Sequence, residues 1–208
     1  PKREGRLLVA VIYEKRNRVA CITINRPEAM NALDGQTMQE VTEAFVDFRD
    51  HDDLWVLIVT GAGDRAFCAG ADLKTMMPGV IERAAEAGSR PVPPLYTGLQ
   101  VYKPIIGAIN GFCLAGGLGL ALLCDLRIAT ENASFGTMGT KRGIIPGGGQ
   151  TQRLPRMVPL AKAMEMLFFA DRIDAQEALR IGLVNQVVPQ PELMPTAWQW
   201  AETLCERA

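Results

Sequence analysis

Short apolar runs recur along the chain, and each is followed by a polar or glycine-rich segment. Leu54–Thr60 is almost entirely apolar and runs into Gly-Ala-Gly, and Ile105–Ile109 and Leu126–Ala129 have the same character. Leu183–Val188 is a fourth such run, near the end of the chain. Runs of this length without polar alternation are typical of strands covered on both faces, so they predict a buried, parallel sheet.

The first part of the chain has a different pattern. Leu7–Tyr13 and Val19–Asn25 are rich in β-branched residues, and the charged segment Glu14–Arg18 separates them. Two such runs joined by a short polar segment predict a hairpin.

Apolar residues at three- and four-residue spacing predict the helices. After Asn31–Asp34, an apolar face is formed by Met38, Val41, Phe45 and Phe48. Helices are also predicted at Leu160–Ala170 and from Pro191 onward. A further helix begins at Asp174, with Glu177 as its reciprocal capping partner, and ends at Gly182. Strands that alternate with helices indicate the α/β fold class.

Residues 78–97 follow neither pattern. Four prolines and two glycines lie among polar residues there, and only Val80–Ala87 has the character of a short helix. The segment is typical of a mobile loop beside a site, and equally of a plain surface connection.

Composition narrows the class of protein. The chain has 208 residues, is 48% hydrophobic and carries a net charge of −1. This balance disfavours partners such as nucleic acid or an anionic membrane. The single histidine, His51, lies in a charged cluster that is typical of a solvated helix end, which argues against histidine-based triads and metal sites. Five cysteines without a Cys-x-x-Cys pair, and the lack of a secretory signal, indicate a cytoplasmic protein.

One stretch has the length of a membrane span. Pro104–Cys124 contains no charged residue, but it does contain Asn110 and several glycines. A strand, a tight turn and a buried helix account for it better than a membrane helix does.

Two glycine-bearing turns are the candidates for chemistry. Phe67–Leu73 follows the predicted strand at 54–60, and Asn110–Gly117 leads from a strand into a helix. A helix beginning at Gly116 leaves backbone N–H groups unpaired, and the small residue Ala71 leaves its own N–H accessible. Two such donors aimed at one point form an oxyanion hole. The alternative is that both are closely packed turns without chemistry. A phosphate-binding loop lacks its Gly-Lys-Ser/Thr or G-x-G-x-x-G pattern here.

Five segments in order resemble the enoyl-CoA hydratase/isomerase (crotonase) family over essentially the whole chain. They are NRPEAMNAL at 25–33, FCAGADL at 67–73, INGFCLAGGLGLALLCDLRIA at 109–129, FGTMGTKRGIIPGGGQTQRLPR at 135–156 and ADRIDAQEALRIGLVNQVV at 170–188.

The resemblance implies a spiral of ββα units that binds coenzyme A thioesters. It divides the chain into a core at 1–190 and, at 191–208, the start of a C-terminal helical region that continues in family members. It implies that Ala71 and Gly116 hold the thioester oxygen, and that the protein forms homotrimers or dimers of trimers. No tightly bound cofactor or metal is expected, because coenzyme A arrives as part of the substrate. Contacts to coenzyme A are implied for Glu28, Ala29, Met30, Ala69, Gly70, Asp72, Leu73 and Gly117.

The sequence departs from the family at both acid/base positions. Hydratases of the family carry a glutamate at each, where this chain has Gly119 and Gly139. Glycine cannot transfer a proton, and general acid–base catalysis contributes roughly 10²–10⁴-fold, so efficient hydration is not expected. Dihydroxynaphthoyl-CoA synthases resemble the chain in their glycine at the second position, where bicarbonate serves as base. Their later aspartate, however, corresponds to Pro146.

The sequence leaves open which groups would transfer protons in place of the two glutamates. A bound anion or water near Gly139, or another side chain, would have to replace the glutamates. The side chains available are Thr137, Thr140, Lys141, Arg142, Tyr96, Tyr102, Glu82 and Arg83, each of which is also an ordinary surface or packing residue. The loss of both glutamates is expected to enlarge the pocket for a bulky acyl group. Asp125 is expected to be structural, near Arg127.

The leading hypothesis is an acyl-CoA enzyme that stabilises an enolate; the alternative is a non-catalytic acyl-CoA-binding homologue.

Overall fold

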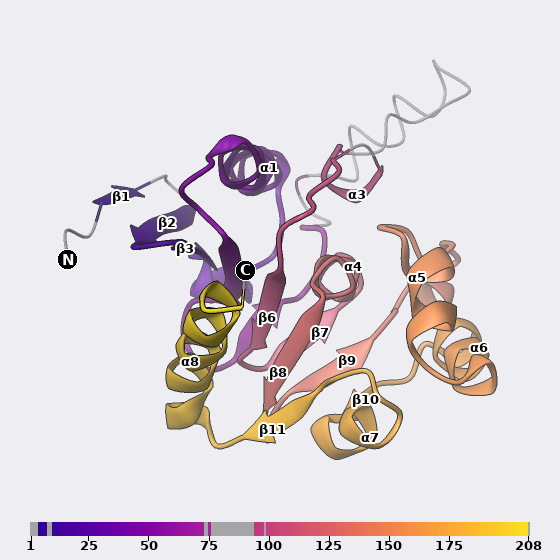
Figure 1. Cartoon of the computed structure of the whole chain (residues 1–208). Helices are drawn as coiled ribbons and strands as arrows, with labels where there is room; N and C mark the ends of the chain where they lie inside the picture. Colours follow the sequence, from indigo (N-terminus) through magenta and orange to yellow (C-terminus); the bar gives the residue numbers. More distant parts are fainter. Residues whose placement is uncertain (1–3, 8–9, 73–74, 76–93, 98, 208) are drawn as a thin grey trace.

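A computed structural model describes all residues except 1–3, 8–9, 73–74, 76–93, 98 and 208 (Figure 1). Two sheets lie at its centre and helices surround them. The strands are β1 (Glu4–Leu7), β2 (Val11–Arg16), β3 (Val19–Ile24), β4 (Val56–Gly61), β5 (Ala66–Cys68), β6 (Ile105–Ile109), β7 (Phe112–Leu114), β8 (Leu126–Thr130), β9 (Ser134–Gly136), β10 (Ile173–Asp174) and β11 (Gln186–Val188). The α-helices are α1 (Gly35–Asp50), α3 (Pro94–Thr97), α4 (Gly116–Ala121), α5 (Gln150–Met157), α6 (Leu160–Phe169), α7 (Ala175–Arg180) and α8 (Leu193–Cys205). The 3-10 helices are η1 (Pro27–Ala29), η2 (Thr140–Arg142) and η3 (Gln190–Glu192).

The chain winds repeatedly between the two sheets. The larger sheet has the order β1-β2-β3-β4-β6-β8-β11, and the smaller one β10-β9-β7-β5. Each of β4, β6 and β8 lies in the larger sheet and is followed directly by a short strand of the smaller sheet. β3, β4, β6, β8 and β11 pair in parallel, as do β5, β7 and β9. This repeated passage confirms the predicted α/β class and its spiral of ββα units.

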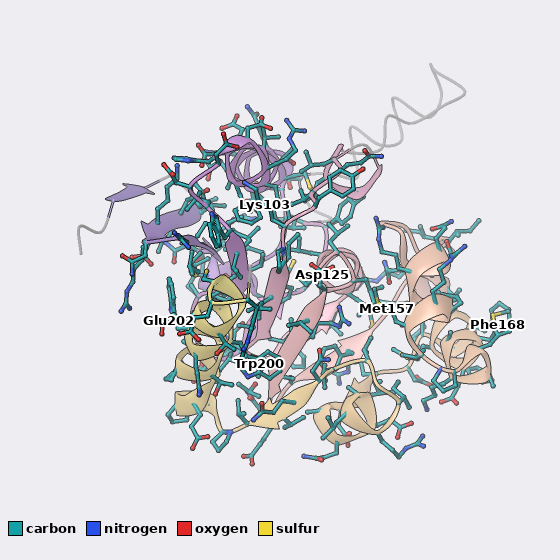
Figure 2. The ribbon with its side chains drawn as sticks, in the orientation of Figure 1. Lys103, Asp125, Met157, Phe168, Trp200 and Glu202 are labelled. Atoms are coloured by element: carbon teal, nitrogen blue, oxygen red, sulfur yellow. The ribbon has the colours of Figure 1, made fainter. Side chains whose placement is uncertain are left out.

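Burial on both faces of the larger sheet explains the continuous apolar runs. Leu57 and Val59 of β4 point into the core that also holds α1, while Val56 and Ile58 point into a second core. The second core is closed by α8, from which Trp200 reaches toward the sheet (Figure 2). Because neither face meets water, the side chains of β4 are apolar except for that of Thr60, whose buried hydroxyl donates to Ala108 O at 2.8 Å.

The hairpin has a shorter turn than predicted, and its first strand begins at Val11 rather than Leu7. β2 continues to Arg16 and pairs with Val19, so only two residues form the turn between the strands. The charged residues tolerate the strand because their side chains find partners at its edge. Lys15 pairs with Asp47 of α1, 2.8 Å away, and the Arg16 guanidinium lies over the Trp198 ring of α8. β1 and the smaller sheet were not predicted.

The helix signals have a mixed outcome. Asp174 caps α7 by accepting a hydrogen bond from the backbone N–H of Glu177, and Gly182 follows the helix with a φ of +77°. The predicted reciprocal bond is wrong, because the Glu177 carboxylate pairs instead with Arg180 and Lys162. Arg180 lies one turn further along α7, and Lys162 reaches Glu177 from α6.

Two buried asparagines fasten the crossings between the sheets. Asn110, at the end of β6, donates from its side chain to Gly61 O (2.8 Å) and Gly63 O (2.7 Å). Asn31 donates to Ala66 O, 2.6 Å away, and is completely buried. These side-chain amides satisfy backbone carbonyl groups in the segment that connects β4 to β5 and at the adjoining ends of the two strands.

The helices of the described part of the chain are all too short or too polar to cross a membrane. The predicted mobile loop and its short helix, Val80–Ala87, lie outside the described residues. Only the end of that region is described, where α3 begins at Pro94.

Candidate functional site

The two predicted oxyanion residues lie side by side. Ala71 follows β5 and Gly116 begins α4, and the parallel pairing of β5 with β7 brings both turns to the same end of the smaller sheet. A Cβ placed on Gly116 would lie 3.5 Å from the backbone nitrogen of Ala71. In the described residues neither backbone N–H has a protein acceptor within hydrogen-bond distance. Two adjacent unpaired donors are the geometry that an oxyanion requires.

The turn before α4 is held in a strained conformation. Ala115 has φ +49° and ψ −119°, a backbone region that alanine rarely adopts. Its N–H donates to Gly136 O at 2.8 Å, and its carbonyl accepts from Gly119 N at 3.1 Å. Because both sides of Ala115 are tied, the direction of the following Gly116 N–H is fixed.

Close packing also accounts for two of the glycines. A Cβ on Gly117 would lie 2.1 Å from Cys68 O, so only glycine lets α4 approach β5. Gly70 has φ +98°, and a Cβ there would lie 2.8 Å from the Ala115 Cβ. The alternative reading of these turns as closely packed is therefore right for Gly70 and Gly117. Packing does not explain the unpaired N–H groups of Ala71 and Gly116.

The segments expected to contact coenzyme A adjoin one another. Met30 O accepts from Ala69 N at 3.1 Å, and Leu33 exchanges two backbone hydrogen bonds with the turn at 70–72. Glu28 is exposed, while Ala29 and Met30 are half-buried. The structure thus brings Glu28–Met30, Ala69–Asp72 and Gly117 together; Leu73 lies outside the described residues.

The side chain of Arg26 connects Asp72, next to Ala71, with Ala32 and Asp34, and we call these contacts the Arg26 brace. Its guanidinium lies 3.2 Å from Asp34 Oδ2 and 3.3 Å from Asp72 Oδ2, and it donates to Ala32 O at 2.7 Å. Burial acts to raise the pKa of Asp34, but hydrogen bonds from Thr37 and the Arg26 charge outweigh it and leave that pKa below its ordinary value. The brace was missed from the sequence, where Arg26 was only part of a quoted motif.

Both vacated acid/base positions are closed. A Cβ on Gly119 would lie 2.9 Å from Gly148 O and 3.4 Å from Tyr96 Cε1. A Cβ on Gly139 would lie 2.7 Å from Ile144 O and 3.1 Å from Pro146 N. The expectation that these glycines enlarge the pocket is wrong, because backbone from residues 144–148 occupies the space where a glutamate side chain would begin.

The structure separates the other candidate acid/base residues. Thr137 donates to Met166 O and Thr140 to Leu167 O, so both hydroxyls are used in packing against α6. Lys141 is exposed and ion-paired with Asp171. Tyr102 is 89% exposed and bonds Gln100. Arg142 is exposed as well, and Glu82 and Arg83 lie outside the described residues.

Tyr96 alone among the described candidates touches the oxyanion turn. Its hydroxyl donates to Gly116 O at 3.0 Å, and its side chain is buried with 6% exposure. The sequence offered no signal for this contact beyond the presence of a tyrosine.

Asp125 has the structural role that was expected of it. Its carboxylate accepts from Ile105 N at 2.9 Å, at the start of β6 (Figure 2). The buried Arg127 guanidinium instead donates to the carbonyls of Leu183, Ala121 and Cys124. In the described residues, no cluster of histidine, cysteine, aspartate and glutamate has the arrangement of a metal site.

Comparison with known proteins gives consistent results. Residues 14–208 match the family model described as enoyl-CoA hydratase/isomerase. The chain is 43% identical over 198 residues to (E)-benzylidenesuccinyl-CoA hydratase of Thauera aromatica, covering 95% of this chain and 77% of that protein. It is 45% identical over 185 residues to crotonyl-CoA hydratase of Syntrophomonas wolfei, covering 89% and 71%. Among solved structures, carnitinyl-CoA hydratase from Mycobacterium avium superposes with a TM-score of 0.86 at 38% identity, covering 97% of this chain and 77% of that one.

Proposed function

This chain belongs to the enoyl-CoA hydratase/isomerase family, and from that premise we propose that it is an enzyme acting on acyl-CoA thioesters through a stabilised enolate. The observation that carries the proposal is the pair of unpaired N–H groups at Ala71 and Gly116, on turns whose glycines permit close approach of a ligand. The relatives' names, which all refer to CoA thioesters, support the same substrate class.

In this proposal the thioester oxygen accepts hydrogen bonds from both N–H groups. These bonds strengthen as negative charge develops on the oxygen, so the α C–H becomes more acidic and the enolate is stabilised. Loss of one such donor in other enzymes reduces kcat by about 10²–10³-fold. The coenzyme A moiety would lie along Glu28–Met30 and Ala69–Leu73, with Gly117 behind the oxyanion.

The reaction that follows is not ordinary two-glutamate hydration. Backbone fills the space at Gly119 and Gly139, so neither position offers a proton-transfer group. We propose enolate chemistry such as isomerisation, decarboxylation, C–C bond hydrolysis or racemisation. An anion near Gly139 remains part of the proposal as a replacement base, and bicarbonate-dependent turnover would be its signature.

The experiment is α-proton exchange in D₂O with a panel of acyl-CoA thioesters, followed by mass spectrometry. We expect deuterium at the α carbon or a new product, and loss of at least about 10²-fold on Gly116→Pro, which removes one N–H donor. Gly35→Pro is the matched control, since Gly35 is also the first residue of a helix and has open space around it. Equal rates in wild type and Gly116→Pro would exclude the oxyanion role.

Closure of both glutamate positions also favours a second candidate, a protein that binds acyl-CoA without turnover. The same panel separates the two. Tight binding without exchange or product for every thioester would select the binding protein over the enzyme.

Self-association is part of the proposal, as a homotrimer or a dimer of trimers. Light scattering on the eluting protein measures its mass directly. A monomer at micromolar concentration would contradict it.

A further inference from the structure

Tyr96 fills the space that the residue at position 119 leaves free. Its ring atom Cε1 lies 3.4 Å from where a Cβ would be on Gly119, and 3.4 Å from where one would be on Gly148. Gly148 itself contributes the nearest backbone atom to Gly119. Two glycines that are distant in the sequence thus lie beside the same atom of a single aromatic ring.

The hydroxyl of the same residue bonds the oxyanion turn. Tyr96 Oη, from α3, donates to Gly116 O, in the first turn of α4, at 3.0 Å. On the other side of Gly116, Ala115 is held by Gly136. The residue that carries one of the two unpaired N–H groups is therefore held both through the preceding residue and through its own carbonyl.

We propose that Tyr96 is a positioning residue, which directs the Gly116 N–H toward the thioester oxygen while its ring replaces the side chain that position 119 lacks. This inference rests on the proposed function, because it concerns the same oxyanion site. Gly119 and Gly148 lie beside this ring for separate reasons: a Cβ on Gly119 would meet Gly148 O at 2.9 Å, and Gly148 has a φ of +62°, which favours glycine.

Tyr96 acts here as a fixed donor. Burial raises the pKa of Tyr96 well above its ordinary value, with the neighbouring thiols Cys68 and Cys113 acting in the same direction. The hydroxyl therefore keeps its proton at neutral pH. Its effect on catalysis is expected to show no pH dependence of its own.

The chain supplies a matched control. Tyr102 lies six residues later, is 89% exposed, and bonds Gln100 rather than the oxyanion turn. Tyr96→Phe and Tyr102→Phe remove the same atom, one from the proposed position and one from the surface.

The test uses 4-(dimethylamino)cinnamoyl-CoA, whose absorbance moves to longer wavelength when its thioester carbonyl is polarised. We expect wild type and Tyr102→Phe to give the same red shift on binding. Tyr96→Phe is expected to give a smaller red shift at an unchanged Kd, and a roughly tenfold lower kcat for α-proton exchange at an unchanged KM, since the donor is misdirected rather than lost.

A second variant protects the test against misfolding of the first. Gly119→Ala keeps the tyrosine and presses a methyl group against its ring and Gly148 O; we expect the red shift to fall here too. Thermal unfolding of each variant shows that it is folded at the assay temperature.

The remaining outcomes are distinct. An unchanged red shift and rate in Tyr96→Phe would overturn the inference, as would a weakened Kd with a full red shift, which would make the residue a wall of the pocket. If wild type does not bind the chromophoric thioester or any other, the proposed function fails first, and the role of Tyr96 fails with it.

Discussion

The oxyanion turns and the two vacated glutamate positions lie in one region and have opposite characters. Among the described residues the backbone donors of Ala71 and Gly116 have no protein acceptor, and a Cβ on Gly116 would meet nothing closer than 3.5 Å. At Gly119 and Gly139, in contrast, a Cβ would lie 2.9 Å from Gly148 O and 2.7 Å from Ile144 O. The same residue type thus opens one half of the site and closes the other.

Under the proposed function, polarising the carbonyl and transferring the proton are separate tasks. The first depends on backbone geometry, which the spiral of short strands enforces through pairing of β5 with β7. The second depends on two side chains that can be lost without disturbing that pairing. A family member can therefore keep its thioester geometry while its reaction changes.

The largest effect is expected from a substitution of Gly117, which lies next to Gly116 and packs against Cys68. Gly117→Ala places a methyl group about where Cys68 O now lies, 2.1 Å from the ideal Cβ. We expect α4 to shift away from β5, destabilising the fold by about 3 kcal/mol or more and abolishing acyl-CoA binding. Denaturant unfolding and equilibrium binding measure the two effects.

The control for this change is Gly147→Ala. Nothing lies within 4 Å of a Cβ at Gly147, so the same substitution should alter stability by less than about 1 kcal/mol. Similar losses at both positions would contradict the assigned packing.

The next effect concerns the two positions that lack a glutamate, Gly119 and Gly139. Gly119→Glu with Gly139→Glu restores the hydratase residues, but each Cβ would meet a carbonyl oxygen at under 3.0 Å. We expect reduced stability and no crotonyl-CoA hydration, monitored by the loss of enoyl absorbance. A stable double variant with new hydratase activity would show that the space at these positions is available after all.

A smaller effect is expected from a substitution of Arg26, which removes the Arg26 brace. Arg26→Gln removes the cation shared by Asp34 and Asp72 and is expected to cost about 1–3 kcal/mol. Acyl-CoA affinity should fall several-fold because the Ala71 turn loses support. Arg49→Gln, which breaks the exposed pair with Asp50, should leave the free energy of unfolding almost unchanged.

The smallest effect is the pH dependence of that brace. The pKa of Asp34 is lowered in the fold, so its ionised form stabilises the protein above the unfolded pKa of about 3.9, and this contribution disappears as pH falls through the lower folded value. Asp34→Asn keeps a good helix cap without the charge. We expect wild type to be the more stable at pH 7 and to lose that advantage below about pH 4. An equal advantage at both pH values would exclude this linkage.

The sequence predicted the larger sheet well because burial on both faces leaves an unmistakable apolar run, as in β4. It failed for β5, β7 and β9, which have three residues each, too few to show a period. It also ended the hairpin early, since the attraction of Lys15 to Asp47 comes from a helix more than thirty residues away in the chain.

The site was predictable where a motif fixes backbone geometry, and not where distant segments meet. The family resemblance named Ala71 and Gly116, and the structure places them in contact distance of one another; their role in binding stays a prediction. The closure at Gly119 depends on Gly148 and Tyr96, neither of which has any local pattern that points to it. Whether space remains where a glutamate is missing depends on residues that are distant in the sequence but close in the fold.

The buried cysteines of the smaller sheet provide a measure of how often the site opens. Cys68 and Cys113 are completely buried, one on each of the two paired strands that carry the oxyanion turns. Burial raises the pKa of the Cys68 thiol to about 12, so the unreactive thiol form dominates while the fold is intact. An alkylating reagent in water can reach these sulfur atoms only in molecules where the two strands have separated. The rate of their labelling under native conditions therefore reports the free energy of local opening at the proposed acyl-CoA site, independently of any substrate.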